Sequence, residues 1–494
     1  MNTTDLIIIG SGPGGYRAAQ HAAAGGLAVV IIERGHVGGT CLNCGCIPTK
    51  TLCRNAELAQ MMAKADTFGF RNLKYELDFA QVIARKNQVV ENLRQGVETL
   101  MKSPGITLVR GEARFTAPHV VAVGDEEYTA PHIIIATGSK AKMLPIPGID
   151  NEKVVTSTEL LDIDHVPARL CIVGAGVIGM EFASIFSSLG SEVTVVEYLK
   201  ECLPMLDSDV AKRLRQTIAR RGVTFVMQAA VKEVNAEGVV YERKGKTDVA
   251  KANVVLMATG RMAQTDGLCL EQAGVECGRG GIIVDDELRT NVEGIYAIGD
   301  ANGRMMLAHA ATAQGLHVVN RILGADDHID LNLIPSAIFT LPEAASVGLS
   351  EDSCKERQLA YSCHKGYYRS NGKAMAMDEA EGLVKLLADE AGRIIGCHVY
   401  GAHAADIVQE AASLMAMGAT LHQLRDIVHI HPTLSEILQE AAGQAGLLPG
   451  RAIRGCLKII EPQKFFPTSG AQFISAYLAV SSNLTKTVWL FLFP

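Results

Sequence analysis

Aromatic side chains and an excess of positive charge are both lacking in this sequence. Only 5% of its 494 residues are Phe, Trp or Tyr, and the formal net charge is −7. A chain without a basic excess lacks the electrostatic signature of nucleic-acid binding, so small molecules or proteins are the expected partners. With 48 glycines and 48% hydrophobic residues, the composition favours a nucleotide-binding α/β protein of several domains.

Segments that would direct the chain to or through a membrane are also lacking. No basic stretch precedes the apolar N-terminal residues, as a secretory signal would require, so we expect a cytoplasmic location. Apolar stretches in the tail after Gly446 are short and are interrupted by Asn483 and Lys486, so we expect no membrane span. We interpret this tail as an atypical extension.

Cysteines are clustered at only one place. Most of the twelve stand singly among apolar residues, as Cys171 does, and are expected to be small buried side chains in a reducing compartment. The exception is CLNCGC, which brings together Cys41, Cys44 and Cys46. We expect no metal, because no second Cys/His pair lies nearby at a ligand-like spacing. A reducible disulfide against a flavin explains the cluster better, because it can pass two electrons between a dithiol and a nicotinamide.

A nucleotide-binding fingerprint lies just before this cluster. An apolar strand pattern leads into GSGPGG at residues 10–15, and an Ala-rich helix pattern follows. Gly10 makes the tight turn, Gly12 lets the backbone approach a pyrophosphate, and Gly15 lets helix and strand pack closely. The next apolar strand ends at Glu33, whose carboxylate can accept a hydrogen bond from a ribose hydroxyl.

The same pattern recurs at GAGVIG, residues 174–179, where Gly174, Gly176 and Gly179 have the same duties. The following strand ends at Glu197. A carboxylate there bonds the free 2′-hydroxyl of NAD and repels the 2′-phosphate of NADP, so we expect NAD.

Both units end on the phrase Ala-Thr-Gly, which includes Thr137 and Gly138 in the first and Thr259 and Gly260 in the second. This internal repeat indicates a duplicated nucleotide-binding fold. One chain is therefore expected to bind two dinucleotides.

Residues 38–50, GGTCLNCGCIPTK, resemble the redox motif of the pyridine nucleotide-disulfide oxidoreductases. The resemblance implies that Cys41 and Cys46 form the redox disulfide, with Cys41 meeting the substrate and Cys46 lying next to the flavin. It also implies that Lys50 and Glu181 form a pair near flavin N5. Cys44 departs from the family, which usually has an aliphatic residue there. We favour a buried small side chain over a redox role for it.

HIHPTLSE, residues 429–436, resembles the C-terminal signature of the same family. The resemblance makes His431 the acid/base and Glu436 the residue that orients it. A dithiol needs such a base because thiols are poor nucleophiles near neutral pH, and an imidazole with a pKa near ~6.5 can take and return the proton. His429 is either structural or ancillary to the site.

The resemblance further implies that Asp300 holds the ribityl chain of FAD and that Val177 lines the nicotinamide site. The residues expected at FAD are Gly10, Gly12, Gly15, Glu33, Thr40, Lys50, Thr137, Gly138, Asp300 and Ala308. Those expected at NAD are Gly174, Gly176, Val177, Gly179, Glu197 and Gly260.

The resemblance covers residues 1 to about 446 and implies two Rossmann-like domains and a C-terminal α+β dimerisation domain. The expected divisions are an FAD-binding domain at 1–145 with a return segment at 263–335, an NAD-binding domain at 146–262, a dimerisation domain at 336–446, and the extension at 447–494.

The activity implied by the resemblance is oxidation of protein-bound dihydrolipoamide with reduction of NAD. Its partners would be the lipoyl domains of 2-oxoacid dehydrogenase or glycine cleavage complexes, and its active sites would be shared across a homodimer. The alternative is NAD(P)H-dependent reduction of another disulfide, such as a glutathione-like substrate. A non-catalytic flavoprotein scaffold is a third possibility, which the intact Cys41, Cys46, His431 and Glu436 argue against.

Overall fold

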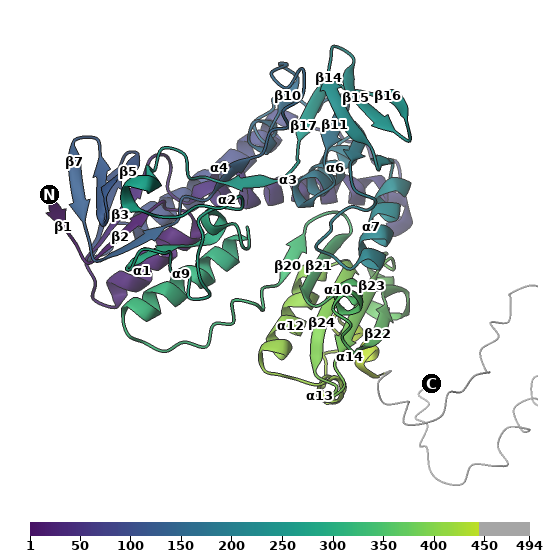
Figure 1. Ribbon diagram of the computed structural model, residues 1–494. Helices are drawn as coiled ribbons and strands as arrows, with labels where there is room; N and C mark the ends of the chain where they lie inside the picture. Colours follow the sequence, from purple (N-terminus) through teal and green to yellow (C-terminus); the bar gives the residue numbers. More distant parts are fainter. Residues whose placement is uncertain (444–494) are drawn as a thin grey trace, which may run out of the picture. The chain divides into compact units, whose positions relative to one another are not determined.

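The computed structural model describes residues 1–443 (Figure 1). The extension expected at 447–494 lies outside the described residues. Parallel sheets flanked by helices, followed by an antiparallel sheet with helices, confirm the predicted fold class. No helix within residues 1–443 is long and apolar enough to cross a membrane.

The first parallel sheet is built around β2 (Leu6–Ile9), whose side chains are all buried. A strand that is apolar on both faces must be buried on both, as in parallel sheets whose two faces are packed against helices. α1 (Pro13–Ala24) packs on this sheet and lies beside α9 (Ala308–Ile322) (Figure 1). The strands in spatial order are β19 (Ile295–Ala297), β8 (His132–Ile135), β2, β3 (Val29–Glu33) and β4 (Ile106–Arg110).

The second parallel sheet repeats this plan, with α6 (Val177–Ser188) packed on it and α7 (Ser208–Arg220) following. Its strands are β10 (Val154–Val155), β17 (Val254–Met257), β11 (Arg169–Val173), β12 (Glu192–Glu197) and β13 (Thr224–Met227).

Smaller sheets accompany both parallel sheets. One contains β1 (Asn2–Thr3), β7 (Glu126–Thr129), β6 (Val120–Val123) and β5 (Ala113–Ala117), and another contains β14 (Ala230–Val234), β15 (Gly238–Arg243) and β16 (Lys246–Lys251). An antiparallel pair joins β9 (Ser139–Ala141) to β18 (Arg261–Ala263), so the segments after the two Ala-Thr-Gly phrases lie side by side.

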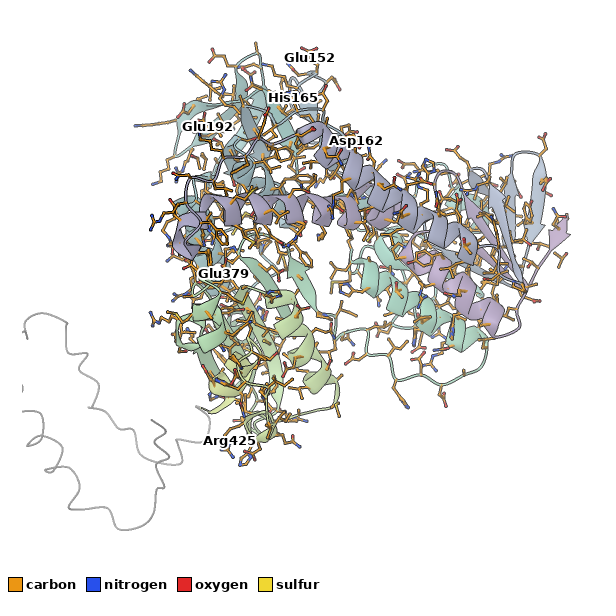
Figure 2. All side chains as sticks on the ribbon, turned by 180° about the vertical axis from the view of Figure 1, so that it is seen from behind. Glu152, Asp162, His165, Glu192, Glu379 and Arg425 are labelled. Atoms are coloured by element: carbon orange, nitrogen blue, oxygen red, sulfur yellow. The ribbon has the colours of Figure 1, made fainter. Side chains whose placement is uncertain are left out.

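Long helices connect the two nucleotide-binding units. α3 (Cys46–Ala63) packs against both α4 (Phe79–Leu100) and α6. Lys86 of α4 is buried, and its ammonium pairs at 2.5 Å with Asp162, which is labelled in Figure 2. The remaining elements here are α2 (Gly39–Cys44), η1 (Ala65–Phe68), α5 (Ser157–Leu160), α8 (Leu270–Ala273) and η2 (Gly299–Asn302).

The C-terminal portion is an antiparallel sheet with helices. Its strands are β20 (Ser336–Ile338), β21 (Glu343–Gly348), β24 (Ile394–Gly401), β23 (Leu383–Ala388) and β22 (Ser362–Tyr367). Its helices are α10 (Glu351–Glu356), η3 (Tyr368–Ser370), α11 (Gly372–Ala376), α12 (Ala404–Ala416), α13 (Leu421–Asp426), which carries Arg425 (Figure 2), and α14 (Glu436–Gly443). The domain boundaries given above stay predictions.

Two helices begin within the glycine fingerprints at residues 10–15 and 174–179, rather than after them. α1 begins at Pro13 and α6 at Val177, because the extended residues Gly12 and Gly176 are the N-caps and the residues after them are already helical. Pro13 is tolerated because a first-turn residue has no helical N–H bond to lose.

Candidate active site

The two redox cysteines lie where α2 and α3 meet at Gly45. Cys41 is in α2, and Cys46 is the first residue of α3. A Cβ at position 45 would lie 2.9 Å from the carbonyl oxygen of Thr40, so a larger residue would push the two helices apart. Both cysteines are free thiols in the structure and are hydrogen-bonded to each other.

This hydrogen bond makes the two sulfurs unequal. The Cys41 thiol donates to the sulfur of Cys46 and lowers the pKa of Cys46 to about 7, although burial opposes the shift. The Lys50 ammonium lowers that pKa further. The same hydrogen bond, together with burial, raises the pKa of Cys41. Near neutral pH, therefore, Cys46 is the sulfur that ionises, whereas Cys41 keeps its proton.

Lys50 and Glu181 form the expected pair beside these sulfurs. The Lys50 ammonium lies 2.9 and 3.0 Å from the two carboxylate oxygens of Glu181, which also accepts from the Phe339 amide at 2.9 Å. Burial alone would lower the pKa of Lys50, but the Glu181 carboxylate outweighs this and the pKa is raised. Lys50 is therefore a permanent positive charge next to Cys46.

Cys44 has a different environment. Burial raises its pKa, although a hydrogen bond with Thr158 and the charge of Arg261 oppose the shift. A protonated thiol is a weak nucleophile, so Cys44 is less reactive as a nucleophile than Cys46 at neutral pH.

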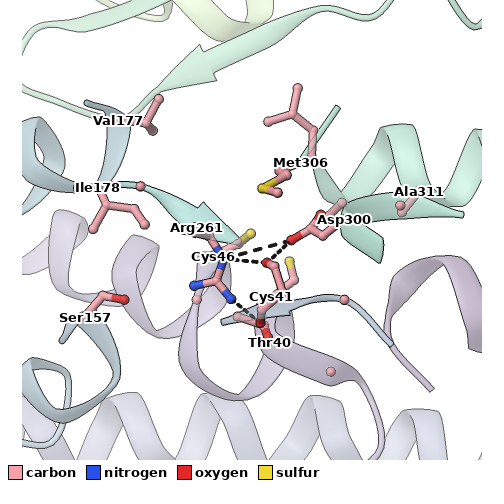
Figure 3. A pocket seen from close by; sticks show the side chains of 18 of the residues that line it. Thr40, Cys41, Cys46, Ser157, Val177, Ile178, Arg261, Asp300, Met306 and Ala311 are labelled. Atoms are coloured by element: carbon pink, nitrogen blue, oxygen red, sulfur yellow. Dashed lines mark hydrogen bonds and ion pairs between the residues drawn. The ribbon is translucent and has the colours of Figure 1, made fainter. Parts of the chain in front are cut away.

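A cavity of about 2250 Å³ joins the cysteines to both fingerprints (Figure 3). Sites for a single small ligand have volumes of roughly 300–1,000 Å³, so this cavity has room for more than one ligand. The predicted residues that line it are Gly10, Gly12, Glu33, Thr40, Cys41, Cys46, Lys50, Thr137, Gly138, Gly174, Gly176, Val177, Glu181, Glu197, Gly260, Asp300 and Ala308.

The first fingerprint fits a dinucleotide. A Cβ on Gly10 would lie 2.4 Å from the Ala136 oxygen, and a Cβ on Gly15 would lie 1.9 Å from the Gly10 oxygen, so neither position admits a larger residue. The Glu33 carboxylate accepts from the amides of Ser11 at 2.9 Å and Gly35 at 2.8 Å. A carboxylate has about four acceptor sites, so Glu33 can still bind a ribose hydroxyl.

The second fingerprint has the same geometry. A Cβ on Gly179 would lie 2.0 Å from the Gly174 oxygen, whereas a Cβ on Gly176 would meet nothing within 4 Å and would fill open space. The Glu197 carboxylate accepts from the amides of Ala175 at 2.5 Å and Leu199 at 2.7 Å, as Glu33 does from Ser11 and Gly35. This backbone also fits a dinucleotide.

The structure adds two residues that sequence reasoning missed. The Ser139 hydroxyl donates to the Asp300 carboxylate and accepts from the Arg261 guanidinium at 2.7 Å. The Arg261 guanidinium also lies 3.9 Å from Asp300 (Figure 3). Ser139 and Arg261 directly follow the two Ala-Thr-Gly phrases. Their equivalent places in the repeat were the signal that could have identified them.

His431 and Glu436 are together, but apart from the cavity. The Nδ1 atom of His431 lies 2.9 Å from Glu436, which also accepts from the Thr433 amide at 2.8 Å. The Thr433 amide and His431 lower the pKa of Glu436. The side chain of His431 is 80% exposed, and neither residue lines the cavity. The side chain of His429, by contrast, is only 5% exposed and bonds Glu410 at 2.9 Å.

The match to known families decides the classification. Residues 4–315 match the family model described as pyridine nucleotide-disulphide oxidoreductase, and residues 334–442 match the dimerisation domain of that family. The chain belongs to the pyridine nucleotide-disulphide oxidoreductases. It is a flavoprotein oxidoreductase with the FAD and NAD cofactors of this family, which confirms the resemblance and the cofactors predicted from the sequence.

Individual members of the family are similar along most of the chain. Dihydrolipoyl dehydrogenase 1, mitochondrial, of Arabidopsis thaliana is 38% identical over 89% of each chain. Dihydrolipoyl dehydrogenase of Chlamydia trachomatis is 37% identical over 89% of this chain and 96% of its own, and leghemoglobin reductase of Glycine max is 38% identical over 89% and 87%. The HOCl-induced flavoprotein disulfide reductase RclA from Escherichia coli superposes with a TM-score of 0.80 at 29% identity, covering 89% of this chain and 99% of that one.

Proposed function

We propose that this chain is a dihydrolipoyl dehydrogenase, which oxidises protein-bound dihydrolipoamide to lipoamide and reduces NAD to NADH. The observation that carries the proposal is one continuous cavity that joins an asymmetric Cys41–Cys46 dithiol to both glycine fingerprints. Similarity of 37–39% to dihydrolipoyl dehydrogenases over 89% of the chain supports the choice of substrate.

The sulfur chemistry follows from the asymmetry of the pair. A substrate thiolate attacks Cys41 of the disulfide, forms a mixed disulfide and releases Cys46 as a thiolate stabilised by Lys50. The second substrate thiol then attacks the substrate sulfur that is bonded to Cys41. This breaks the mixed disulfide, closes the lipoamide ring and releases Cys41. FAD, when bound, supplies the two-electron relay from the dithiol to NAD. The substrate loses two electrons and two protons; NAD gains the two electrons and one proton, and the other proton is released to solvent.

The base for the substrate thiols is proposed to come from a second subunit. His431 lies outside the cavity of its own chain, and beside it Val428 and Ile430 are 92% and 81% exposed. Exposed apolar side chains next to an acid/base indicate an interface, and the chain carries a dimerisation domain. In a twofold dimer, His431 of the partner subunit would complete each site, with Glu436 stabilising the imidazolium.

Steady-state kinetics test the proposal. The purified flavoprotein should turn over dihydrolipoamide with NAD and be far slower with glutathione disulfide and NADPH. The Cys46→Ser variant should retain FAD but lose this turnover, which excludes a contaminating activity. Faster turnover with glutathione disulfide would contradict the proposal.

The second candidate is reduction of another disulfide, which similarity to the flavoprotein disulfide reductase RclA favours. Preferred turnover of a non-lipoyl disulfide with NADH would support it. For the leading proposal, the partners are lipoyl domains of 2-oxoacid dehydrogenase or glycine cleavage complexes, and a lower KM for a lipoylated domain than for free dihydrolipoamide would support this. A cytoplasmic location is part of the proposal and is tested by cell fractionation.

A further inference from the structure

The loop that follows Glu197 forms part of the wall of the NAD side of the cavity. Tyr198, Leu199, Pro204 and Met205 all line the cavity. In the middle of the loop, the buried Leu203 donates its amide to the Ala175 oxygen at 3.0 Å. Ala175 is the residue whose own amide binds Glu197, so the loop is tied directly to the fingerprint.

This loop ends at Asp207, which is 1% exposed. Its carboxylate accepts from the Asp209 amide at 3.1 Å, at the start of α7, and from the Glu351 amide at 3.1 Å. It also pairs with the Lys385 ammonium at 2.6 Å. The Asp207 amide donates to Nδ1 of His398 at 3.2 Å. The end of the loop is therefore bonded to the C-terminal sheet through both its side chain and its backbone.

Lys385 is 0% exposed and lies in β23, 178 positions after Asp207 in the sequence. It forms a second ion pair with Glu351 at 2.5 Å. Buried ion pairs rarely add net stability over apolar contacts of the same shape, because both charges must be dehydrated. Such pairs do hold the two segments in one relative position, because moving one partner away would leave the other charge buried and unpaired. The arrangement is thus better suited to holding the loop in place than to strengthening the fold.

We infer that Lys385 is a positioning residue for the NAD site, acting through Asp207 on the loop at 198–206. This rests on the proposed assignment of the second fingerprint to NAD. When the tether is lost, the loop samples other positions, and Ala175 and Glu197 lose the constraint that orients them toward the adenosine half of the nucleotide. NAD binding weakens, whereas the dithiol reaction at Cys41 and Cys46 is unaffected.

The test measures direct NADH binding to the holoenzyme by fluorescence, together with KM for each substrate. Lys385→Met should weaken NADH binding and raise the KM for NAD about tenfold, within the usual range of coupling between sites. The KM for dihydrolipoamide should not change. Because Lys385→Met strands two carboxylates, the double variant Asp207→Asn/Lys385→Met is measured as well. The double variant removes the charge of the fully buried Asp207, while the Glu351 carboxylate is 21% exposed and keeps a hydrogen bond from the Tyr361 hydroxyl. It should show the same loss of NADH affinity.

The control is Lys86→Met, which removes another buried lysine and its 2.5 Å ion pair with Asp162. It should lower the thermal midpoint while NADH affinity stays at the wild-type value. Wild-type NADH affinity in a folded double variant would overturn the inference. So would an equal loss of affinity in Lys86→Met. Wild-type enzyme that binds NADH but does not oxidise dihydrolipoamide would contradict the proposed function only, because NADH binding is measured without that substrate.

Discussion

Three cysteines within six residues differ in acidity because each has a different neighbour. Cys46 accepts a hydrogen bond from Cys41 and lies near Lys50, and its pKa falls to about 7. Burial dominates at Cys44 and raises the pKa. The hydrogen bond that stabilises the Cys46 thiolate holds the proton on Cys41, whose pKa rises. The arrangement of donors, rather than the number of cysteines, decides which sulfur is ionised.

Replacing the donor therefore shifts the titration of Cys46. In Cys41→Ser a hydroxyl still donates, and alkylation of Cys46 by iodoacetamide should reach half its maximal rate near pH 7. In Cys41→Ala no donor remains, and the midpoint should rise to or above the ordinary thiol value of ~8.5. Mass spectrometry of the peptide that contains Cys46 gives both profiles and separates it from Cys44. Equal midpoints in the two variants would show that the hydrogen bond is not the main cause.

Glu197 should determine the choice between NAD and NADP. It is 9% exposed and already positioned by two amides, so a 2′-phosphate would meet a fixed negative charge. Such repulsion is worth about 2 kcal/mol or more, which corresponds to about a 30-fold preference in kcat/KM for NAD. Glu197→Gln should reduce this preference. Its repeat equivalent, Glu33→Gln, should weaken FAD retention and leave the NAD/NADP ratio unchanged. A wild-type enzyme that uses both coenzymes equally would contradict the prediction.

At the scale of elements, local patterns predicted the strand-turn-helix units well. The apolar run before Gly10 and the glycine spacing encode a buried strand and a tight turn within a dozen residues. The return of β19 to the first sheet required the family resemblance, because pairing between Ile295 and Ile133 leaves no local trace. The small sheets beside the two parallel sheets were not predicted, since their half-buried strands carry weak patterns. The contact between Lys385 and Asp207 was also missed, because only the folded chain brings them together.

His398 should make the C-terminal sheet sensitive to acid. Burial lowers its pKa, the charge of Lys385 acts in the same direction, and Asp207 and Asp352 oppose them. A histidine with a lowered folded pKa is neutral in both states above the unfolded value of ~6.5. Below it, the unfolded chain binds the proton first, which costs up to about 1.4 kcal/mol of stability per pH unit. Stability is thus complete above that pH and falls as the pH decreases.

The variant His398→Gln tests this cause, because its amide can accept from the Asp207 amide and donate to the Leu349 oxygen as the imidazole does. The difference in apparent Tm between pH 7.5 and pH 5.5 should be smaller in this variant than in the wild-type holoenzyme. His132 and His364, whose pKa values burial also lowers, contribute equally to both proteins. If the Tm difference between the two pH values is the same in His398→Gln as in the wild type, His398 is not the cause and the acid sensitivity comes from other groups, such as His132 and His364.

At the scale of the whole molecule, one chain contains an incomplete site. The dithiol, Lys50, Glu181 and residues of both fingerprints line the cavity, but His431 and Glu436 lie outside it. Sequence reasoning identified both groups of residues, and the family resemblance implied a site shared across a homodimer. The fold adds that the two groups are separate within one chain. A proton acceptor must come within hydrogen-bonding reach of the substrate thiols, which supports the proposal that a second subunit supplies it.

Mixed dimers distinguish a shared site from an internal one. Subunits that carry Cys46→Ser and subunits that carry His431→Gln, with different affinity tags, are coexpressed, and the heterodimer is isolated by two successive purifications. If His431 acts across the interface, one of the two sites combines an intact cysteine pair with an intact His431, and activity should return to about half the wild-type value per dimer. If His431 acts within its own chain, every site has one defect and the heterodimer is as inactive as the two parent homodimers. A wild-type monomer that is fully active at high dilution would likewise contradict the shared site, because each chain would then contain everything that the reaction requires.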